Sequence, residues 1–214
     1  MSVATDYYRS YVDATYGNPN KMAETFEKII RLPNKKSDNH GRFQAVRNFA
    51  SVCFPETKYP SLLDVGSGLG VFPFLVKKNK WPCTALDPDP RAVAHIKNKI
   101  GINTICGDFL LIPSSGKFDI ITLNKVLEHV EDPISMLKKA HDWLAPGGFV
   151  YIEVPDGEVA RYKGPEREEF TIEHLHIFSF LSLGVLCAKA GFLVQSISRL
   201  CEPSTKYTLR AFLR

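Results

Sequence analysis

The sequence lacks any pair of cysteines at the C-x-x-C spacing that zinc sites and thiol redox motifs use. Its cysteines are odd in number and scattered along the chain: Cys53, Cys83, Cys106, Cys187 and Cys201. Such a distribution argues against a disulfide framework and indicates reduced thiols, which are typical of intracellular proteins. We therefore predict a cytoplasmic location.

Long apolar runs are scarce as well. Residues 1–12 carry tyrosines and charges where a signal peptide needs an apolar core. The most apolar later stretch, residues 178–194, is interrupted by Lys189 and Gly191 and is too short to cross a bilayer comfortably. We therefore expect no membrane insertion.

Neither sign of charge dominates the composition. The chain has 27 lysines and arginines against 23 aspartates and glutamates, a formal net charge of +4. This excess is too small and too evenly spread to indicate a nucleic-acid partner. The hydrophobic content of 44% is that of an ordinary globular domain, and 214 residues suffice for one α/β domain with a small helical addition. The composition leaves the oligomeric state open.

The pattern of apolar residues changes near residue 60. Before it, apolar side chains recur at helical spacing around residues 22–30 and 43–53, with a polar loop expected at residues 33–41. After it, strand-like and helix-like segments alternate, which predicts a parallel sheet covered on both faces. We predict an N-terminal helical lid over residues 1–60 and a ligand-binding domain over residues 61–214.

Seven segments of the second region are predicted strands, and a turn at Glu202-Pro203-Ser204 predicts that the last two form an antiparallel hairpin. The expected strands are Ser61–Val65, Cys83–Leu86, Asn103–Cys106, Phe118–Leu123, Phe149–Val154, Phe192–Leu200 and Tyr207–Leu213. The fold class is therefore α/β, with a mostly parallel seven-stranded sheet that ends in a C-terminal antiparallel hairpin.

Two helices carry the same start signal, a capping aspartate followed by a proline in the first turn. Asp89-Pro90 begins one of them. Asp132-Pro133 begins the other, which we expect to continue through Leu144 and to stop at Gly147-Gly148. A last helix is expected over residues 180–190, with Ser179 as its cap.

The first predicted strand ends at an acid and runs into glycines at every second position. Asp64 is followed by Gly66, Gly68 and Gly70, with Ser67 between the first two glycines. Glycine tolerates positive φ and lets a backbone approach a ligand closely, and the helix that follows would point its N-terminal amides at that ligand. A dinucleotide fingerprint has its third glycine one residue later, which disfavours an NAD-dependent oxidoreductase.

Polar residues also follow the second and third strands, at the edge where open parallel sheets bind ligands. The second strand ends in Asp87-Pro88, and an acid about 20 residues beyond the glycines can accept hydrogen bonds from both hydroxyls of a nucleoside ribose. The third ends in Asp108-Phe109, where a carboxylate can accept from an adenine amine while the ring covers its face. A simple turn residue is the alternative role for Asp108.

Together with Leu127-Glu128-His129 and Pro146-Gly147-Gly148, this ordered set resembles the class I S-adenosylmethionine (SAM) dependent methyltransferases over residues 62–154. The resemblance implies a Rossmann-like three-layer sandwich, SAM as cofactor and S-adenosylhomocysteine as product. It also implies that Glu128 and His129 stabilise the loop after the fourth strand.

The resemblance assigns the parts of SAM to particular residues. The sulfonium would face Asn124 and Lys125, the ribose would contact Asp87 next to Pro88, and the adenine would contact Asp108 and Phe109. The methionine end would lie on Asp64, Gly66, Ser67, Gly68 and Gly70.

The candidate catalytic residues lie in Glu173-His174-Leu175-His176-Ile177-Phe178-Ser179, after the fifth strand. A histidine can take a proton from a hydroxyl or an acidic carbon near neutral pH, so His174 beside Glu173 is the predicted base. The segment resembles one in methyltransferases of glycan, lipid-precursor or secondary-metabolite pathways, and the Glu-His pair of sugar C-methyltransferases. Two alternatives stay open: a loop histidine bonded to backbone, or a metal site formed by His174 and His176. We predict no metal, because no third ligand at a recognisable spacing appears.

The favoured function is methyl transfer from SAM to an oxygen, nitrogen or carbon nucleophile of a small-molecule or sugar-type acceptor, which includes glycan and lipid precursors. Nucleic-acid methylation is disfavoured, because Asn124-Lys125-Val126 stands where such enzymes carry an Asn/Asp-Pro-Pro-aromatic motif or a Pro-Cys nucleophile. A SAM-binding regulatory or scaffold protein without turnover is the non-enzymatic alternative. An aromatic group in the predicted lid can enclose a sulfonium by cation–π attraction: Tyr7, Tyr8, Tyr11 and Tyr16.

Overall fold

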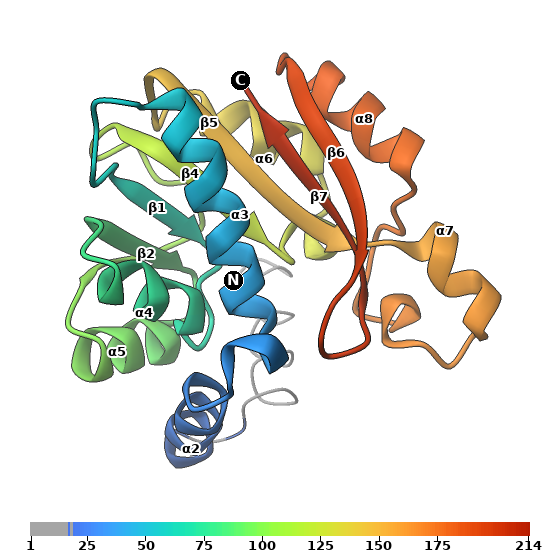
Figure 1. Cartoon of the computed structure of the whole chain (residues 1–214), viewed down its shortest axis with the longest axis horizontal. Coiled ribbons are helices and arrows are strands. Elements are labelled where there is room, and N and C mark those ends of the chain that lie inside the picture. Colours follow the sequence, from blue (N-terminus) through green and yellow to red (C-terminus); the bar gives the residue numbers. More distant parts are fainter. Residues whose placement is uncertain (1–16, 18) are drawn as a thin grey trace.

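The computed structural model describes residue 17 and residues 19–214, and a seven-stranded sheet forms its centre (Figure 1). The strands lie in the order β3-β2-β1-β4-β5-β7-β6. Their bounds are β1 Leu62–Val65, β2 Cys83–Asp87, β3 Asn103–Cys106, β4 Phe118–Asn124, β5 Leu144–Pro155, β6 Val194–Cys201 and β7 Tyr207–Leu213. The predicted α/β fold with a mostly parallel seven-stranded sheet is confirmed.

The first five strands are parallel, with β1 between β2 and β4. The last two form the predicted antiparallel hairpin, and β7 also pairs antiparallel with β5. The strand order reverses at β1, because the chain first builds β2 and β3 on one side and later places β4 on the other. The crevice beyond the carboxyl ends of the two strands at such a switch is where open sheets bind ligands.

Helices cover both faces of the sheet and one end of it (Figure 1). The α-helices are α2 Pro19–Ile30, α3 Asp38–Cys53, α4 Val71–Lys78, α5 Pro90–Lys99, α6 Pro133–Ala140, α7 Gly157–Ala160 and α8 Phe180–Lys189. Short 3₁₀ turns are η1 Asn34–Lys36, η2 Leu127–His129, η3 Arg161–Lys163 and η4 Glu168–Phe170. None of the helices in the described part of the chain combines the length and apolar character that a membrane crossing requires.

The predicted helix caps are confirmed. Asp89 accepts a hydrogen bond from the Arg91 N–H at the start of α5, and Asp132 accepts one from the Ser135 N–H at the start of α6. Ser179 caps α8 with a reciprocal pair of bonds. These side chains satisfy backbone donors that a helix start leaves without a partner.

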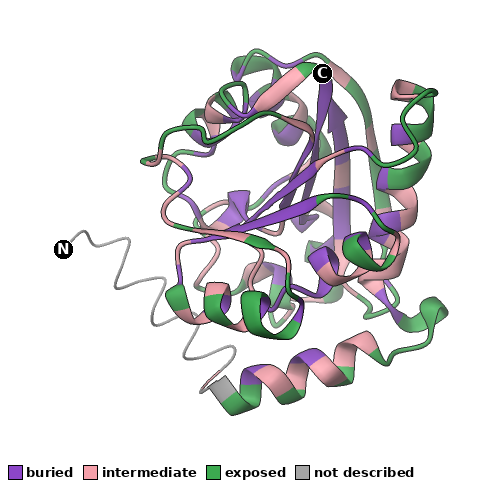
Figure 2. Cartoon of the chain, turned by 90° about the vertical axis from the view of Figure 1, so that its left-hand side faces the viewer, coloured by how far each residue is buried: buried purple, intermediate pink, exposed green. Residues whose placement is uncertain are grey.

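Neighbouring residues of a central strand face opposite layers, because side chains alternate along a strand. In β1, Leu62 shares a buried cluster with Phe72 of α4, whereas Leu63 shares one with Leu137 of α6 and Leu183 of α8. Figure 2 shows the result, with buried strands between helices whose outer surfaces are exposed. This is the predicted three-layer sandwich.

The N-terminal helices take part in the packing of one face. In α3, Phe43 and Val46 join the cluster that contains Leu62, and in α2, Met22 and Phe26 join a cluster with α5. The division into a lid and a domain at residue 60 stays a prediction. The tyrosines expected to line that lid lie outside the described residues: Tyr7, Tyr8, Tyr11 and Tyr16.

The predicted end of the helix that begins at Asp132 is wrong. That helix, α6, ends at Ala140, and Leu144 already belongs to β5. The reason is a long-range pairing, since Leu144 is the register partner of Phe118 in β4. The pair Gly147-Gly148 therefore lies within a strand segment and ends no helix.

The prediction of a polar loop at residues 33–41 is also wrong in part, because this segment is not a loop throughout. It contains the turn η1 and the first residues of α3. The helix begins this early because Ser37 accepts a hydrogen bond from the His40 N–H and caps it. A polar N-terminal turn can be helical when a capping side chain supplies the missing acceptor.

Candidate functional site

The loop between β1 and α4 bends sharply at its glycines. Gly66, Gly68 and Gly70 have φ values of 71°, 50° and 72°, a region that residues with a side chain rarely adopt. A Cβ on Gly66 would lie 2.7 Å from Val126 Cγ2, so the bare backbone lets the loop close on the segment after β4. A Cβ on Gly70 would lie 2.6 Å from Ile100 Cδ1, so this glycine permits α4 to pack on α5.

Asp64 is held at the switch point by the neighbouring strand. Its Oδ1 accepts hydrogen bonds from Thr122 Oγ1 at 2.6 Å and from Asn124 Nδ2 at 2.8 Å, both on β4. The side chain is almost fully buried, and burial raises its pKa to about 6 despite these bonds. The carboxyl group is thus rigid and titrates closer to neutrality than an exposed aspartate.

Asp87 ends β2 and has both carboxylate oxygens bonded to backbone amides. Oδ2 accepts from the Gly68 N–H at 2.8 Å, and Oδ1 accepts from the Asp89 N–H at 2.9 Å. Burial raises the pKa of Asp87 to about 6. Each carboxylate oxygen can accept more than one hydrogen bond, so the group is oriented by the loop and can still bind further donors.

Two adjoining cavities open beyond the ends of β1, β2 and β4, with volumes of about 260 and 410 Å³. Their common wall contains Gly66, Pro88, Val126 and His129. The predicted residues on the first cavity are Asp64, Gly66, Ser67, Gly68, Asp87, Pro88, Asn124 and Lys125. The second is mostly apolar and is lined by Asp108 and Phe109. Gly70 lines neither cavity.

At the end of β3, Asp108 makes the bond of a turn residue, since its Oδ1 accepts from the Leu110 N–H at 2.9 Å. Phe109 is buried, and its ring centroid lies 5.6 Å from that of Trp143. Both residues nevertheless face the second cavity. Their roles as adenine contacts stay predictions.

Arg42 is a lining residue of the first cavity that the sequence analysis missed. Its Nε donates to Glu153 Oε2 at 2.8 Å, and its Nη2 donates to the same oxygen. Burial alone would raise the pKa of Glu153, but Arg42 and Arg210 lower it to about 2. A signal was present, because Arg42 shares the helical spacing of Val46 and Ala50 and so lies on the buried face of α3.

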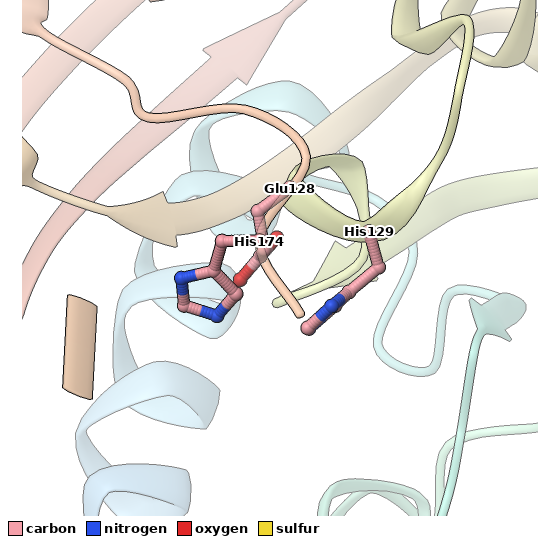
Figure 3. Close-up of side chains that lie close together, drawn as sticks. All are labelled: Glu128, His129 and His174. Atoms are coloured by element: carbon pink, nitrogen blue, oxygen red, sulfur yellow. The ribbon is translucent and has the colours of Figure 1, made fainter. Parts of the chain in front are cut away.

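Glu173 and His174, the candidate catalytic residues, line a third cavity of about 240 Å³. Its wall also includes Lys125, Glu128 and His129. It adjoins the first cavity, because Lys125 and His129 line both. The His174 ring centroid lies 4.9 Å from that of His129 (Figure 3). The candidate base is thus beside Glu128 and His129 and not among the residues of the glycine loop. His176 points elsewhere, with Nε2 donating to the Val130 carbonyl at 2.9 Å.

Comparison with known proteins places the chain in a family. A sequence model of the methyltransferase domain family matches residues 21–197, and the chain belongs to this family. The ubiquinone biosynthesis O-methyltransferase of Coxiella burnetii is 33% identical over 96 residues, which cover 42% of this chain and 41% of that protein. The enzyme of the same name from Pseudomonas paraeruginosa is 29% identical over 99 residues, 43% of each chain. The match therefore spans less than half the length of these relatives.

Solved structures share the fold at low sequence identity. The 1,6-didemethyltoxoflavin-N1-methyltransferase of Burkholderia thailandensis, solved with 1,6-didemethyltoxoflavin and S-adenosylhomocysteine, aligns with a TM-score of 0.69 and 18% identity. That alignment covers 100% of this chain and 91% of the other. A SAM-dependent methyltransferase from Aquifex aeolicus aligns with a TM-score of 0.63 and 17% identity, covering 92% of this chain and 97% of its own. The predicted Rossmann-like methyltransferase fold is confirmed.

Proposed function

We propose that this protein transfers a methyl group from SAM to a small-molecule acceptor. The observation that carries the proposal is the position of the Asp87 carboxylate, which the Gly68 N–H orients at the wall of the first cavity. An acid in this position of a Rossmann-like sheet binds ribose hydroxyls. In this arrangement the methionine end of SAM lies near Asp64 and the sulfonium near Asn124 and Lys125. The adenine enters the adjoining apolar cavity beside Phe109.

The acceptor is proposed to lie in the third cavity, next to the sulfonium end of the cofactor. Its nucleophilic lone pair would form the new bond to the methyl carbon, while the S–CH₃ bond breaks and its electron pair stays on sulfur. Because a sulfonium is an excellent leaving group, the protein chiefly aligns the attack and removes the acceptor's proton. His174 and Glu173 line that cavity and are the predicted catalytic residues.

The names of the similar proteins support an acceptor that presents oxygen or nitrogen, since they include O-methyltransferases and an N-methyltransferase. A cavity of about 240 Å³ favours an acceptor, or part of one, of modest size. A carbon nucleophile fits the proposed chemistry as well, because a base and an in-line methyl donor serve all three atoms.

The test has two stages, binding and turnover. Calorimetric titration should show binding of S-adenosylhomocysteine and none of NAD; the reverse result would overturn the assignment of the cofactor. Incubation with SAM and a panel of phenols, catechols, amines and sugar nucleotides should then give a product that is one methylene heavier by mass spectrometry. Tight binding without product from any acceptor class would instead favour a regulatory SAM-binding protein.

A further inference from the structure

We propose that Glu128, His129 and His174 form a binding site for a divalent transition-metal ion between the proposed cofactor and acceptor cavities. Each residue offers one ligand atom, and these atoms all lie within 4.8 Å of one another. Figure 3 shows the three side chains converging, two from the turn η2 after β4 and one from the segment after η4. No third ligand follows His174 and His176 at a recognisable spacing in the sequence, whereas the fold brings Glu128 and His129 of the turn η2 to His174.

The buried carboxylate of Glu128 makes no hydrogen bond within the described part of the chain. The residue is 1% exposed, and neither of its side-chain oxygens has a hydrogen-bond partner among the described residues. The nearby ammonium of Lys125 donates to Thr208 Oγ1 at 2.8 Å instead. Lys125 attracts this carboxylate through space, but a buried charge without a direct hydrogen bond still costs several kcal/mol, so a carboxylate in this place is expected to face a cation more closely.

Anchoring of the neighbouring loop does not explain the carboxylate. The backbone carbonyl of Glu128, and not its side chain, accepts from the N–H groups of Leu175 and His176 at 2.7 and 3.2 Å. The His176 ring adds a bond to the Val130 carbonyl. The loop is thus attached through main-chain groups and an imidazole. The family role expected for Glu128, stabilising the loop, is carried by its backbone.

The two histidines are arranged as metal ligands usually are. His129 Nδ1 donates to the Glu173 carbonyl at 3.0 Å, and His174 Nδ1 donates to the Glu169 carbonyl at 2.9 Å. A ring that donates from Nδ1 carries its lone pair on Nε2, and a carbonyl on the other nitrogen is the common outer partner of metal-binding histidines. A ring with one N–H and one lone pair is the neutral imidazole. The neutral form is the one that binds a metal.

The donor set selects the kind of ion. Two imidazoles with one carboxylate suit Zn²⁺, Co²⁺, Fe²⁺ or Mn²⁺, whereas Mg²⁺ and Ca²⁺ prefer oxygen ligands alone. Bonds of about 2.0–2.1 Å in a tetrahedral site put donor atoms about 3.3 Å apart, so small side-chain rotations would close the present arrangement on an ion. Three protein ligands also leave a coordination position open, as in catalytic zinc sites.

The chemical role rests on the proposed function. An acceptor hydroxyl in the third cavity would occupy the open position, and coordination would lower its pKa so that its proton passes to solvent. The oxygen lone pair would then form the bond to the methyl carbon as the S–CH₃ electrons move to sulfur. His174 would hold the ion in this scheme, in place of accepting the proton itself.

The decisive experiment measures metal uptake directly, on tag-free protein stripped with a chelator. Titration with Co²⁺, followed by its visible absorption bands, and calorimetry with Zn²⁺ should both give one ion per chain with a dissociation constant of about 1 µM or tighter. E128Q, H129Q and H174Q should each weaken binding by about 100-fold or more. H176Q is the matched control, because it changes a neighbouring histidine outside the cluster, and it should bind as the wild type does.

Thermal unfolding supplies a second readout. Without metal, E128Q should melt higher than the wild type because it removes a buried charge that has no hydrogen bond to a described residue. Zn²⁺ should raise the melting temperature of the wild type and of H176Q, but not that of E128Q. Absence of one-to-one uptake by the wild type, or unchanged uptake in both E128Q and H174Q, overturns the metal site. Titration of the same samples with S-adenosylhomocysteine separates the two proposals. Cofactor binding without metal uptake removes only the metal site, and metal uptake without cofactor binding removes only the proposed function.

Discussion

Arg42 Nε donates to Glu153 Oε2 across 2.8 Å, and this bond joins helix α3 to the central strand β5. From the other side, Arg210 Nε of β7 donates to Glu153 Oε1 at 2.7 Å and its Nη2 donates to Glu202. Glu153 is fully buried, so the two arginines compensate a charge that water cannot reach. Helix α3, the sheet and the C-terminal hairpin thus share one buried charge cluster, and its Arg42 lines the first cavity.

Replacing Glu153 with glutamine should destabilise the protein by about 3–5 kcal/mol, because Arg42 and Arg210 would stay buried without their counter-charge. Urea unfolding monitored by circular dichroism measures the loss. Glu27→Gln is the control, since it breaks an exposed ion pair with Arg31 on α2 and should leave the urea midpoint almost unchanged. Equal midpoints for the two variants would contradict a stabilising role of the cluster.

The lowered pKa of Glu153 predicts that the free energy of unfolding falls in acid. The pKa of Glu153 is lowered to about 2 in the folded protein, whereas an unfolded glutamate titrates near about 4.3. A lowered pKa contributes stability that is fully present above the unfolded value and is lost as the pH falls from about 4.5 towards 2. Urea unfolding of the wild type and E153Q across this interval should show a difference that shrinks with acid. A constant difference would rule out this titration as its source.

Asp87→Asn should weaken binding of S-adenosylhomocysteine by about 10- to 100-fold, because hydrogen bonds to a charged acceptor contribute about 1.5–3 kcal/mol. Calorimetry measures the affinity. Asp119→Asn is the matched control: this carboxylate accepts from Ser61 at the opposite edge of the sheet, away from both cavities. Unaltered affinity in D87N would remove Asp87 from the proposed ribose site.

The affinity for S-adenosylhomocysteine should also fall in mild acid. Asp64 and Asp87 both have a pKa raised to about 6 by burial, and protonation removes their capacity to accept from the ligand. Each group is ionised above about pH 6, so affinity should be constant near pH 8 and decline by up to about tenfold per group for each unit below 6. Titrations between pH 5 and about pH 8 check this, and a flat profile would contradict the role of ionised carboxylates. D87N should show a shallower profile than the wild type.

Gly70→Ala should destabilise the protein by about 2–4 kcal/mol, because its φ is positive and the new Cβ would press on Ile96 of α5 and on Ile100, the residue that follows α5. Gly116→Ala is the control, since a Cβ there meets no atom within 4 Å and its stability should change by about 0.5 kcal/mol or less. Gly70 lines neither cavity, so folded G70A should retain cofactor affinity within a few-fold. A large selective loss of affinity would instead support the direct contact that the family resemblance implies for Gly70.

Features that depend on a few neighbouring residues were predicted correctly from the sequence. Positive φ at Gly66 and helix caps at Asp89 and Asp132 depend on neighbouring backbone groups, so residue type alone predicts them. The predicted end of α6 was wrong because that end depends on a contact between residues far apart in sequence. Leu144 continues a helical pattern along the chain, but its pairing with Phe118 draws it into β5, and a pairing partner is not visible in local spacing.

The sequence by itself determined the α/β fold, the glycine loop and the acids at the strand ends, because hydrophobic alternation and turn chemistry are local properties. Only the tertiary structure decided that Arg42 bonds to Glu153 and that His174 lies close to Glu128 and His129. Those contacts depend on strand order, on register and on the path of the segment after β5. These are properties of the whole folded chain, since they arise from contacts between residues far apart in sequence.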